Sequence, residues 1–279
     1  MTKVVGAYTD PVKQRTPIHP EYAASILDDL AADDAIFTAD TGMCNVWTAR
    51  YLNPNGSRRF ISSALHGSMS NALPHAMGAA WSSPGRQVIS VSGDGGLSML
   101  LGELVTVAMY KLPVKIVVFN NSTLGMVKLE MLVDGLPDFG GVDVPAVDYA
   151  AVAAALGIFS RRIENPADIE AGLRAALDHD GPALVDLVTD PLALSLPPTI
   201  TGGQMKGFAL AMSKMVMNGA SARQYRWPSR ICGTCHVPHS WIRAADLPPP
   251  CLADHAGRGG GKVDLRRAKM AGCLTRPMS

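Results

Sequence analysis

The chain has 279 residues, of which 47% are hydrophobic and 18% charged, a balance that excludes disordered and fibrous proteins. The formal net charge of +1 gives no reason to expect a nucleic-acid partner, and no apolar run approaches the roughly 18 residues of a membrane span. The first residues also lack the apolar stretch of a signal peptide, so we expect a cytoplasmic protein without a transmembrane segment.

The predicted elements alternate between apolar, β-branched strands and helices with helical spacing of their apolar residues. In chain order they are helix 21–32, strand 35–39, strand 59–62, helix 71–81, strand 87–92, helix 97–110, strand 114–119, helix 149–157, strand 159–163, helix 166–178, strand 183–188 and a helix from about residue 203. Repeated strand–helix alternation with buried strands predicts an α/β fold: a doubly wound, mostly parallel six-stranded sheet with helices on both faces.

The composition changes near residue 220. From Ser221 onward the chain carries ten Lys or Arg against three Asp, together with four of its five cysteines. We therefore expect a main domain over 1–195, a helical extension over 196–220 and a divergent, disordered tail over 221–279. A frameshift or a role of its own would each explain this tail. The remaining cysteine, Cys44, stands alone, as is common in a reducing compartment.

Polar residues follow two successive predicted strands. Gly93-Asp94-Gly95-Gly96 follows one and Asn120-Asn121 the next, within one strand–helix–strand unit. If these strands are neighbours, Asp94 and Asn121 meet at the sheet edge, where a carboxylate and an amide oxygen suit Mg²⁺. The glycines would let the backbone approach a phosphate closely. Each motif alone also fits an ordinary Asp-Gly turn or a polar cap. The dinucleotide-binding G-x-G-x-x-G and the P-loop patterns are absent from the sequence.

These residues resemble the thiamine diphosphate motif of the thiamine-dependent enzymes, in which "GDGG" is followed by "NN" at a typical spacing, here 27 from Asp94 to Asn121. Further stretches, among them "HGSMSNALPHAMGA" and "KLPVKIVVFNNSTLGMVKLEM", make residues 1 to 218 similar to the pyruvate dehydrogenase (quinone), or pyruvate oxidase, branch. The alternative is another thiamine-dependent 2-oxo acid enzyme, of the acetolactate synthase or decarboxylase type, or a non-catalytic remnant.

The resemblance implies a site for thiamine diphosphate and Mg²⁺. Its metal ligands would be Asp94, Asn121 and the backbone carbonyl of Thr123. His66 is a candidate proton-transfer group, although a scaffold role fits it equally, and Met126 is a candidate on the substrate side; no catalytic residue is certain. The cofactor-binding residues would be Asp40, Thr41, Gly42, His66, Gly67, Ser68, Met69, Gly93, Asp94, Gly95, Gly96, Asn121, Ser122, Thr123, Leu124, Gly125, Met126 and Val127.

The same resemblance implies partners that this chain does not encode. In the family, the glutamate that activates the cofactor comes from a separate N-terminal domain, and FAD is held by a middle domain of the full-length enzyme. The parent reaction would convert pyruvate to acetate and CO₂ and pass electrons through FAD to a quinone. We therefore expect a homo-oligomer or a complementing N-terminal domain. The family's membrane-associating C-terminal segment is replaced here by the tail, which puts membrane association in doubt.

The tail contains "CGTCH" at 232–236, which has the pattern of c-type haem attachment. With His239 it also offers four ligands for zinc. Haem attachment needs export, and a structural zinc site needs a second, correctly spaced ligand pair, so we interpret the motif as accidental.

Overall fold

A computed structural model describes residues 6, 8–136, 141–193 and 202–217. Contacts divide the chain into two units, Met1–Arg226 and Trp227–Ser279, and every described residue belongs to the first. The "CGTCH" motif and the tail over 221–279 lie outside the described residues. The elements are η1 (Asp10–Val12), α2 (Pro20–Leu30), β1 (Ile36–Ala39), α3 (Met43–Tyr51), β2 (Arg59–Ser62), α4 (Ala72–Ser82), β3 (Val88–Gly93), α5 (Asp94–Met99), α6 (Glu103–Met109), β4 (Val114–Asn120), α7 (Gly125–Val133), α8 (Tyr149–Ala155), β5 (Phe159–Ile163), η2 (Pro166–Asp168), α9 (Ile169–Asp178), β6 (Ala183–Val188) and α10 (Gly202–Met217).

The six predicted strands form one sheet in the order β2-β1-β3-β4-β6-β5, and every pairing in it is parallel. The doubly wound fold is thereby confirmed. β3 and β4 are neighbours, with Gly93 opposite Phe119, so the ends of these two strands meet at the same edge as expected. β6, the last strand in the described residues, lies between β4 and β5.

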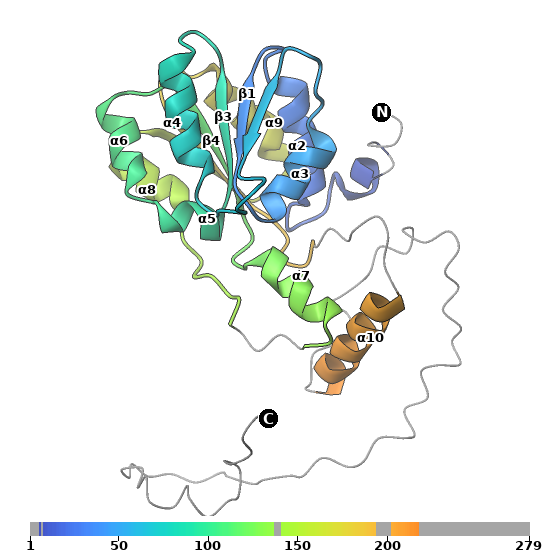
Figure 1. The fold of residues 1–279 in the computed structure, drawn as a ribbon. Helices are drawn as coiled ribbons and strands as arrows, with labels where there is room; N and C mark the ends of the chain where they lie inside the picture. The colour runs from blue at the N-terminus through green and yellow to red at the C-terminus, as the bar shows by residue number, and fades with distance from the viewer. Residues whose placement is uncertain (1–5, 7, 137–140, 194–201, 218–279) are drawn as a thin grey trace, which may run out of the picture. The chain divides into compact units, whose positions relative to one another are not determined.

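Both faces of the sheet are covered by helices (Figure 1). Helices α2, α3 and α9 pack on one face, and α4, α6 and α8 pack on the other. Successive residues of β4 alternate between the two layers: Ile116 belongs to the α4/α6/α8 core and Val117 to the α2/α3/α9 core. Because both sets of side chains are buried in the inner strands β1, β3, β4 and β6, these strands are mostly apolar, whereas the edge strand β2 is exposed along its length.

The helix predicted over 97–110 is wrong in extent, because the structure has two helices there. α5 begins at Asp94, and the segment 100–102 separates it from α6. In this segment Glu103 N donates to Leu100 O and Leu104 N to Leu101 O, so the bonds span three residues instead of four. Gly102, a weak helix former, stands at the break. The sequence reading also missed α3 and α7.

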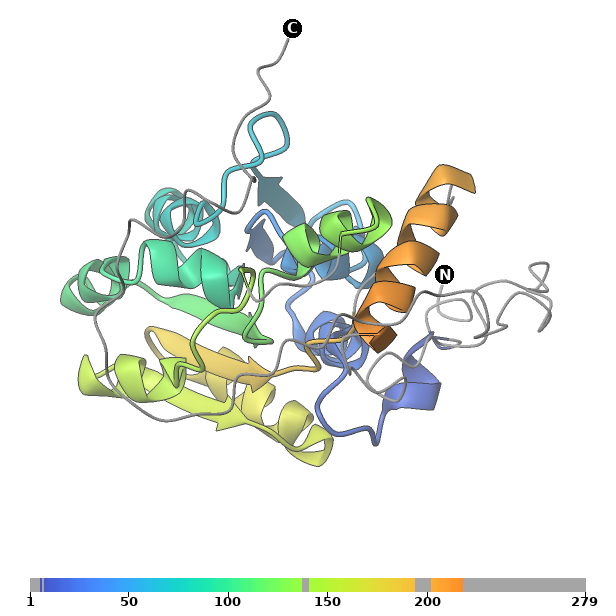
Figure 2. The ribbon, with the colours of Figure 1, turned by 90° about the horizontal axis from the view of Figure 1, so that it is seen from below.

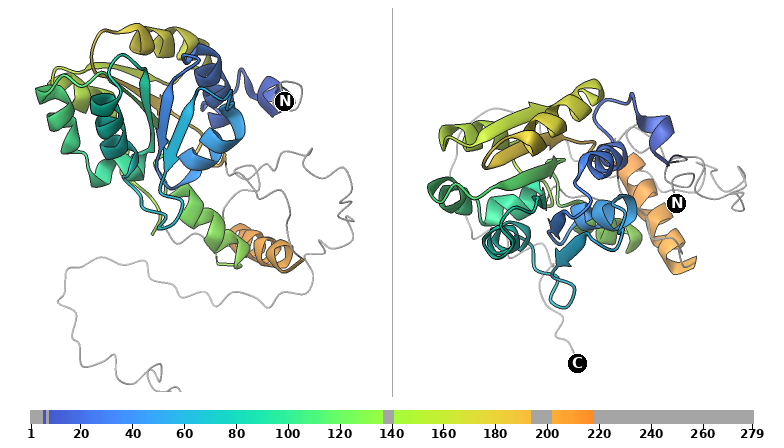
Figure 3. Two further views of the ribbon diagram at one scale, coloured as in Figure 1. Left: turned by 45° about the horizontal axis from the view of Figure 1, so that its top comes forward. Right: turned by 90° about the horizontal axis from the view of Figure 1, so that it is seen from above.

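Helices α7 and α10 lie side by side beyond the strand ends (Figures 2 and 3). Gly207 of α10 approaches the backbone of Val133 so closely that a Cβ there would overlap its carbonyl oxygen. Lys214 Nζ donates to Gly135 O at 3.0 Å. α10 therefore packs directly against a helix that begins at the candidate site. Among the described residues, no helix is both long and apolar enough to cross a bilayer.

Candidate cofactor site

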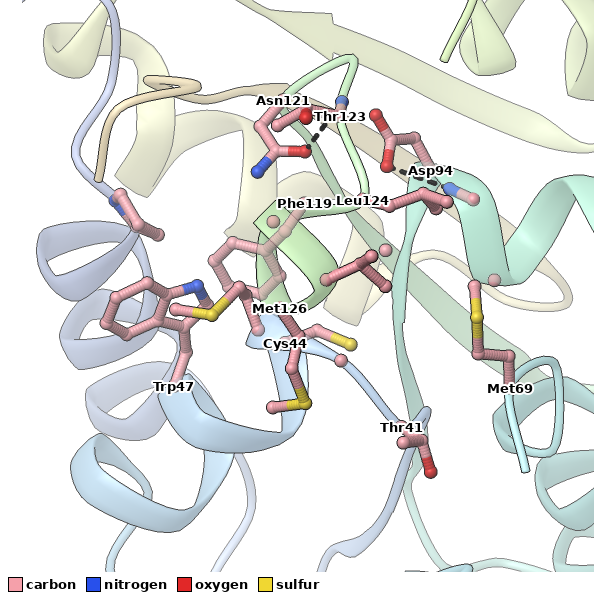
Figure 4. Close-up of a pocket in the computed structure, with 18 of the residues that line it drawn as sticks. Thr41, Cys44, Trp47, Met69, Asp94, Phe119, Asn121, Thr123, Leu124 and Met126 are labelled. Atoms are coloured by element: carbon pink, nitrogen blue, oxygen red, sulfur yellow. Dashed lines mark hydrogen bonds between the residues drawn. The ribbon is translucent and has the colours of Figure 1, made fainter. Parts of the chain in front are cut away.

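The candidate binding site lies at the carboxyl ends of β1, β3 and β4. β1 and β3 are adjacent, but the chain leaves β1 toward β2 and leaves β3 toward β4, in opposite directions. The connections therefore diverge to opposite faces and leave a crevice, which is where open α/β sheets bind ligands. A cavity of about 250 Å³ opens there (Figure 4). Its lining residues come from several separate segments, the first at Pro20 and the last at Ala193.

Asp94 lies at one corner of this cavity, and only 3% of its surface is exposed. Its Oδ1 accepts a hydrogen bond from Gly95 N at 2.8 Å, whereas its buried Oδ2 has no hydrogen-bond partner. Burial raises the pKa of Asp94 to about 6, and nearby backbone N–H groups, that of Gly95 foremost, partly oppose the shift. A buried carboxylate oxygen without a partner is costly, so this atom is suited to a cation.

Asn121 and Thr123 face Asp94 from the turn that follows β4 (Figure 4). Asn121 Oδ1 accepts a hydrogen bond from Thr123 N at 3.2 Å. Ser122 between them has φ of +54°, a left-handed conformation uncommon for a residue other than glycine. A pairing with the 141–144 segment holds this turn, with Leu124 N donating to Val142 O at 2.8 Å.

The glycines of the Asp94 turn are needed for space. A Cβ on Gly95 would lie 2.6 Å from Leu124 Cδ2 and 3.4 Å from Met69 Cε. A Cβ on Gly96 would overlap the carboxylate of Asp40. The turns after β1, β3 and β4 are therefore packed against one another with no room for side chains, and backbone is exposed to the cavity at Gly95 and Gly96.

Most of the residues expected at the cofactor line this cavity. They are Thr41, Gly42, Gly67, Met69, Gly93, Asp94, Gly95, Gly96, Asn121, Thr123, Leu124, Gly125, Met126 and Val127. Asp40, His66, Ser68 and Ser122 are not among the lining residues. His66 and Ser68 are exposed on the β2–α4 loop. Asp40 is instead buried behind the wall, where its Oδ1 accepts from Ala72 N at 2.8 Å and burial raises its pKa.

Sequence reasoning missed several residues of the wall. These are Pro20, Met43, Cys44, Trp47, Phe119, Glu130, Thr189 and Ala193. Glu130 could have been predicted from the sequence. It stands four residues after Met126, so it lies one turn further along the same face of α7. Cys44 is buried, its thiol donates to Asp40 O at 3.3 Å, and burial raises its pKa to about 12. Burial therefore disfavours the reactive thiolate form of Cys44 in the folded chain.

One side of the cavity is closed by a contact between the two ends of the domain. Ile18 pairs with Thr189, and Asp190 N donates to Ile18 O at 2.9 Å. His19 lies between two carboxylates, with Nδ1 3.3 Å from Glu21 and Nε2 3.5 Å from Asp190. This contact holds Pro20 and Thr189 in the wall, although they are far apart in the sequence.

The two asparagines after β4 have different partners. Asn120 is buried, and its Nδ2 donates to Asp186 Oδ1 at 3.0 Å and to Val147 O at 3.0 Å. Asp186 also accepts from Arg162 Nη1 at 2.7 Å. Only Asn121 faces the cavity. Asn120 therefore anchors the end of β4 to the core, and Asn121 remains available for a ligand.

A parallel, doubly wound domain with a glycine turn and a carboxylate at its switch point belongs to the class that binds phosphorylated cofactors. The particular family follows from sequence comparison. Residues 40–187 match the family described as thiamine pyrophosphate enzyme, C-terminal TPP binding domain, and the chain belongs to this family.

Individual relatives agree with this assignment. The chain is 38% identical over 207 residues to YdaP of Bacillus subtilis (strain 168), named as a thiamine pyrophosphate-containing protein, and covers 35% of it with 74% of its own length. It is 34% identical over 197 residues to the chloroplastic acetolactate synthase 2 of Brassica napus, with 68% of this chain and 31% of that protein covered. The chain thus spans about a third of the length of these relatives.

A solved structure shares the fold. The thiamine diphosphate-dependent 4-hydroxybenzoylformate decarboxylase of Rhodococcus jostii RHA1 superposes with a TM-score of 0.56 at 29% identity. The superposition covers 63% of this chain and 33% of that chain.

Proposed function

We propose that the cavity binds the diphosphate of thiamine diphosphate together with Mg²⁺. The observation that carries this proposal is the buried Oδ2 of Asp94, which has no hydrogen-bond partner. It lies beside a turn in which a side chain at Gly95 or Gly96 would clash with neighbouring residues. Among the described residues, no group of three His, Cys, Asp or Glu could hold a metal alone. This fits a Mg²⁺ ion that takes its remaining ligands from a phosphate and water.

In this proposal each part of the wall has a role. Asp94, Asn121 and the carbonyl oxygen of Thr123 hold the metal, and the backbone at Gly95 and Gly96 lies against the diphosphate. Met126 and Val127 present apolar surface on α7, which helps to exclude water from the reacting end of the cavity. When bound, thiamine diphosphate supplies an electron sink for decarboxylation of a 2-oxo acid.

The reaction class proposed for the complete enzyme is that of an acetolactate synthase or decarboxylase acting on a 2-oxo acid. The names of the relatives cited above favour this class over the pyruvate dehydrogenase (quinone) type. The second candidate, with pyruvate as substrate and electrons passing through FAD to a quinone, is supported by the "KLPVKIVVFNNSTLGMVKLEM" segment of the sequence. In either case the activating glutamate would come from a further domain.

Titration calorimetry of the full chain with thiamine diphosphate, with and without Mg²⁺, tests the site. We expect binding that requires Mg²⁺ and is abolished in Asp94→Ala, because the substitution removes the anionic ligand. Asp33→Ala, which removes an exposed carboxylate, should bind normally. Equal affinity for the cofactor in Asp94→Ala and wild type would contradict the proposed site.

Adding a separately expressed N-terminal region of a relative such as YdaP tests the reaction class. Conversion of pyruvate to acetolactate would support the synthase type, whereas pyruvate-dependent quinone reduction would support the second candidate. No turnover despite Mg²⁺-dependent cofactor binding would support a non-catalytic remnant.

A further inference from the structure

Tyr149, the first residue of α8, carries a buried hydroxyl beside the candidate metal site. None of its surface is exposed, and its ring belongs to the apolar core under α4, α6 and α8. A phenolic oxygen in such surroundings needs hydrogen-bond partners, because leaving a buried polar group unpaired destabilises the fold. Both of its partners belong to α5, the helix that begins with Asp94.

The hydrogen bonds form a directed chain. The Tyr149 hydroxyl donates to the backbone carbonyl of Asp94 at 3.1 Å and lies 2.7 Å from Ser98 Oγ. Tyr149 has one hydroxyl proton, and the Asp94 carbonyl can only accept, so that proton goes to Asp94. The Ser98 hydroxyl therefore donates to the Tyr149 oxygen. One phenol thus connects the first residue of α5 with a residue one turn later.

The backbone of Tyr149 is held equally firmly. Its N–H donates to Asp186 Oδ2 at 3.1 Å, and Asp186 is fully buried. The same carboxylate accepts from Asn120 Nδ2 at 3.0 Å and pairs with Arg162 at 2.7 Å. Asn120 directly precedes Asn121. One buried carboxylate therefore fixes both turns: that of Asn121 through Asn120, and that of Asp94 through Tyr149.

We propose that Tyr149 is a positioning residue for the metal site, whose hydroxyl holds the Asp94 turn at a fixed distance from Asn121. This inference rests on the proposed function. Mg²⁺ requires near-ideal octahedral geometry at about 2.0–2.1 Å, whereas Ca²⁺ accepts irregular geometry at about 2.3–2.6 Å. A rigid pair of turns therefore favours Mg²⁺, and a looser pair weakens Mg²⁺ more than Ca²⁺.

The test substitutes Tyr149→Phe and measures Mg²⁺ and Ca²⁺ affinity by calorimetry in the presence of excess thiamine diphosphate. We expect the Mg²⁺ affinity to fall about threefold to tenfold, the range produced by losing one hydrogen bond, and the Ca²⁺ affinity to fall less. The ratio of the two affinities is the decisive measurement, because lower overall stability alone would not change it. Tyr110→Phe, at a tyrosine that is 59% exposed, is the matched control.

Ser98→Ala provides a second variant that leaves the core side chains in place, since Ser98 is exposed. It removes the donor that orients the Tyr149 hydroxyl, so we expect a smaller shift of the ratio in the same direction. Wild-type Mg²⁺-dependent cofactor binding with an unchanged ratio in both variants would overturn the inference alone. Absence of that binding in the wild type would overturn the proposed function and, with it, the inference.

Discussion

Replacing Asp94 by Asn should stabilise the metal-free protein while removing its metal site. The Asp94 carboxylate is buried, and its pKa rises from an ordinary 3.8 to about 6 in the fold. Each unit corresponds to 1.36 kcal/mol, so ionised Asp94 disfavours the folded state by about 3 kcal/mol. Asn has nearly the same shape and does not ionise. At pH 7.5, we expect the free energy of unfolding of Asp94→Asn to exceed that of the wild type by up to about 3 kcal/mol.

The stability difference between Asp94→Asn and the wild type should depend on pH. Between pH 3.8 and about 6 the folded wild type binds more protons than the unfolded chain, so its stability falls as the pH rises through this range. The advantage of Asp94→Asn should therefore be fully present above pH 6 and vanish near pH 4. Urea unfolding in the presence of EDTA, from pH 4 to 8, measures it. With saturating Mg²⁺ and thiamine diphosphate the wild type should regain the difference, because only it binds the metal.

Asp33→Asn is the matched control, because it removes the same charge from an exposed position. It should leave the free energy of unfolding within about 0.5 kcal/mol of wild type at every pH. An Asp94→Asn variant that is no more stable than wild type at pH 7.5, or whose advantage does not depend on pH, would refute the reasoning.

Three further predictions concern space and reactivity. Gly95→Ala should weaken cofactor binding in calorimetry, because its Cβ would push into the turn after β4. The control Gly78→Ala, in open space on α4, should bind normally and stabilise the protein by about 0.5–1 kcal/mol. Unchanged affinity in Gly95→Ala would contradict this packing. Gly207→Ala should detach α10 from α7 and speed amide exchange over 202–217, whereas Gly202→Ala, with no atom nearby, should not. Cys44 should resist iodoacetamide at pH 8 until denaturant is added, because burial raises its pKa to about 12; rapid labelling of the native Cys44 peptide, seen by mass spectrometry, would argue against this.

The inner strands could be predicted well because burial on both faces gives each a short, mostly apolar run, whereas β2 is exposed along its length and has no such run. β2 and β6 begin and end where the sequence predicts. α3 was missed because "MCNVWTARY" mixes polar and apolar residues without a clear stripe, and it begins after Gly42, whose φ of +148° is rarely adopted by residues other than glycine. The break between α5 and α6 was missed because the apolar residues on both sides of Gly102 fit one helical pattern, and a single glycine inside such a pattern is compatible with a continuous helix.

The candidate site could be predicted only where residues adjoin a motif. Asp94 and Asn121 follow from their strand ends, but the sequence does not say that Asn120 turns toward Asp186 while Asn121 faces the cavity. Pro20 and Thr189 reach the wall only through the pairing of Ile18 with Thr189, a contact between distant segments. Such contributions depend on tertiary packing, which periodicity does not report.

The position of β6 makes the domain sensitive to where its chain is cut. Within the part of the chain that the structure describes, β5 pairs only with β6, and β6 is the last strand to be synthesised. Until then β4 has an open edge and β5 has no partner in the sheet, so a chain ending before residue 183 loses two strands rather than one. The segment that closes the cavity at Thr189 is missing from such a chain as well. A nascent chain should therefore gain the complete cavity only after β6 and Thr189 have been synthesised, and a chain cut before residue 183 should not gain it.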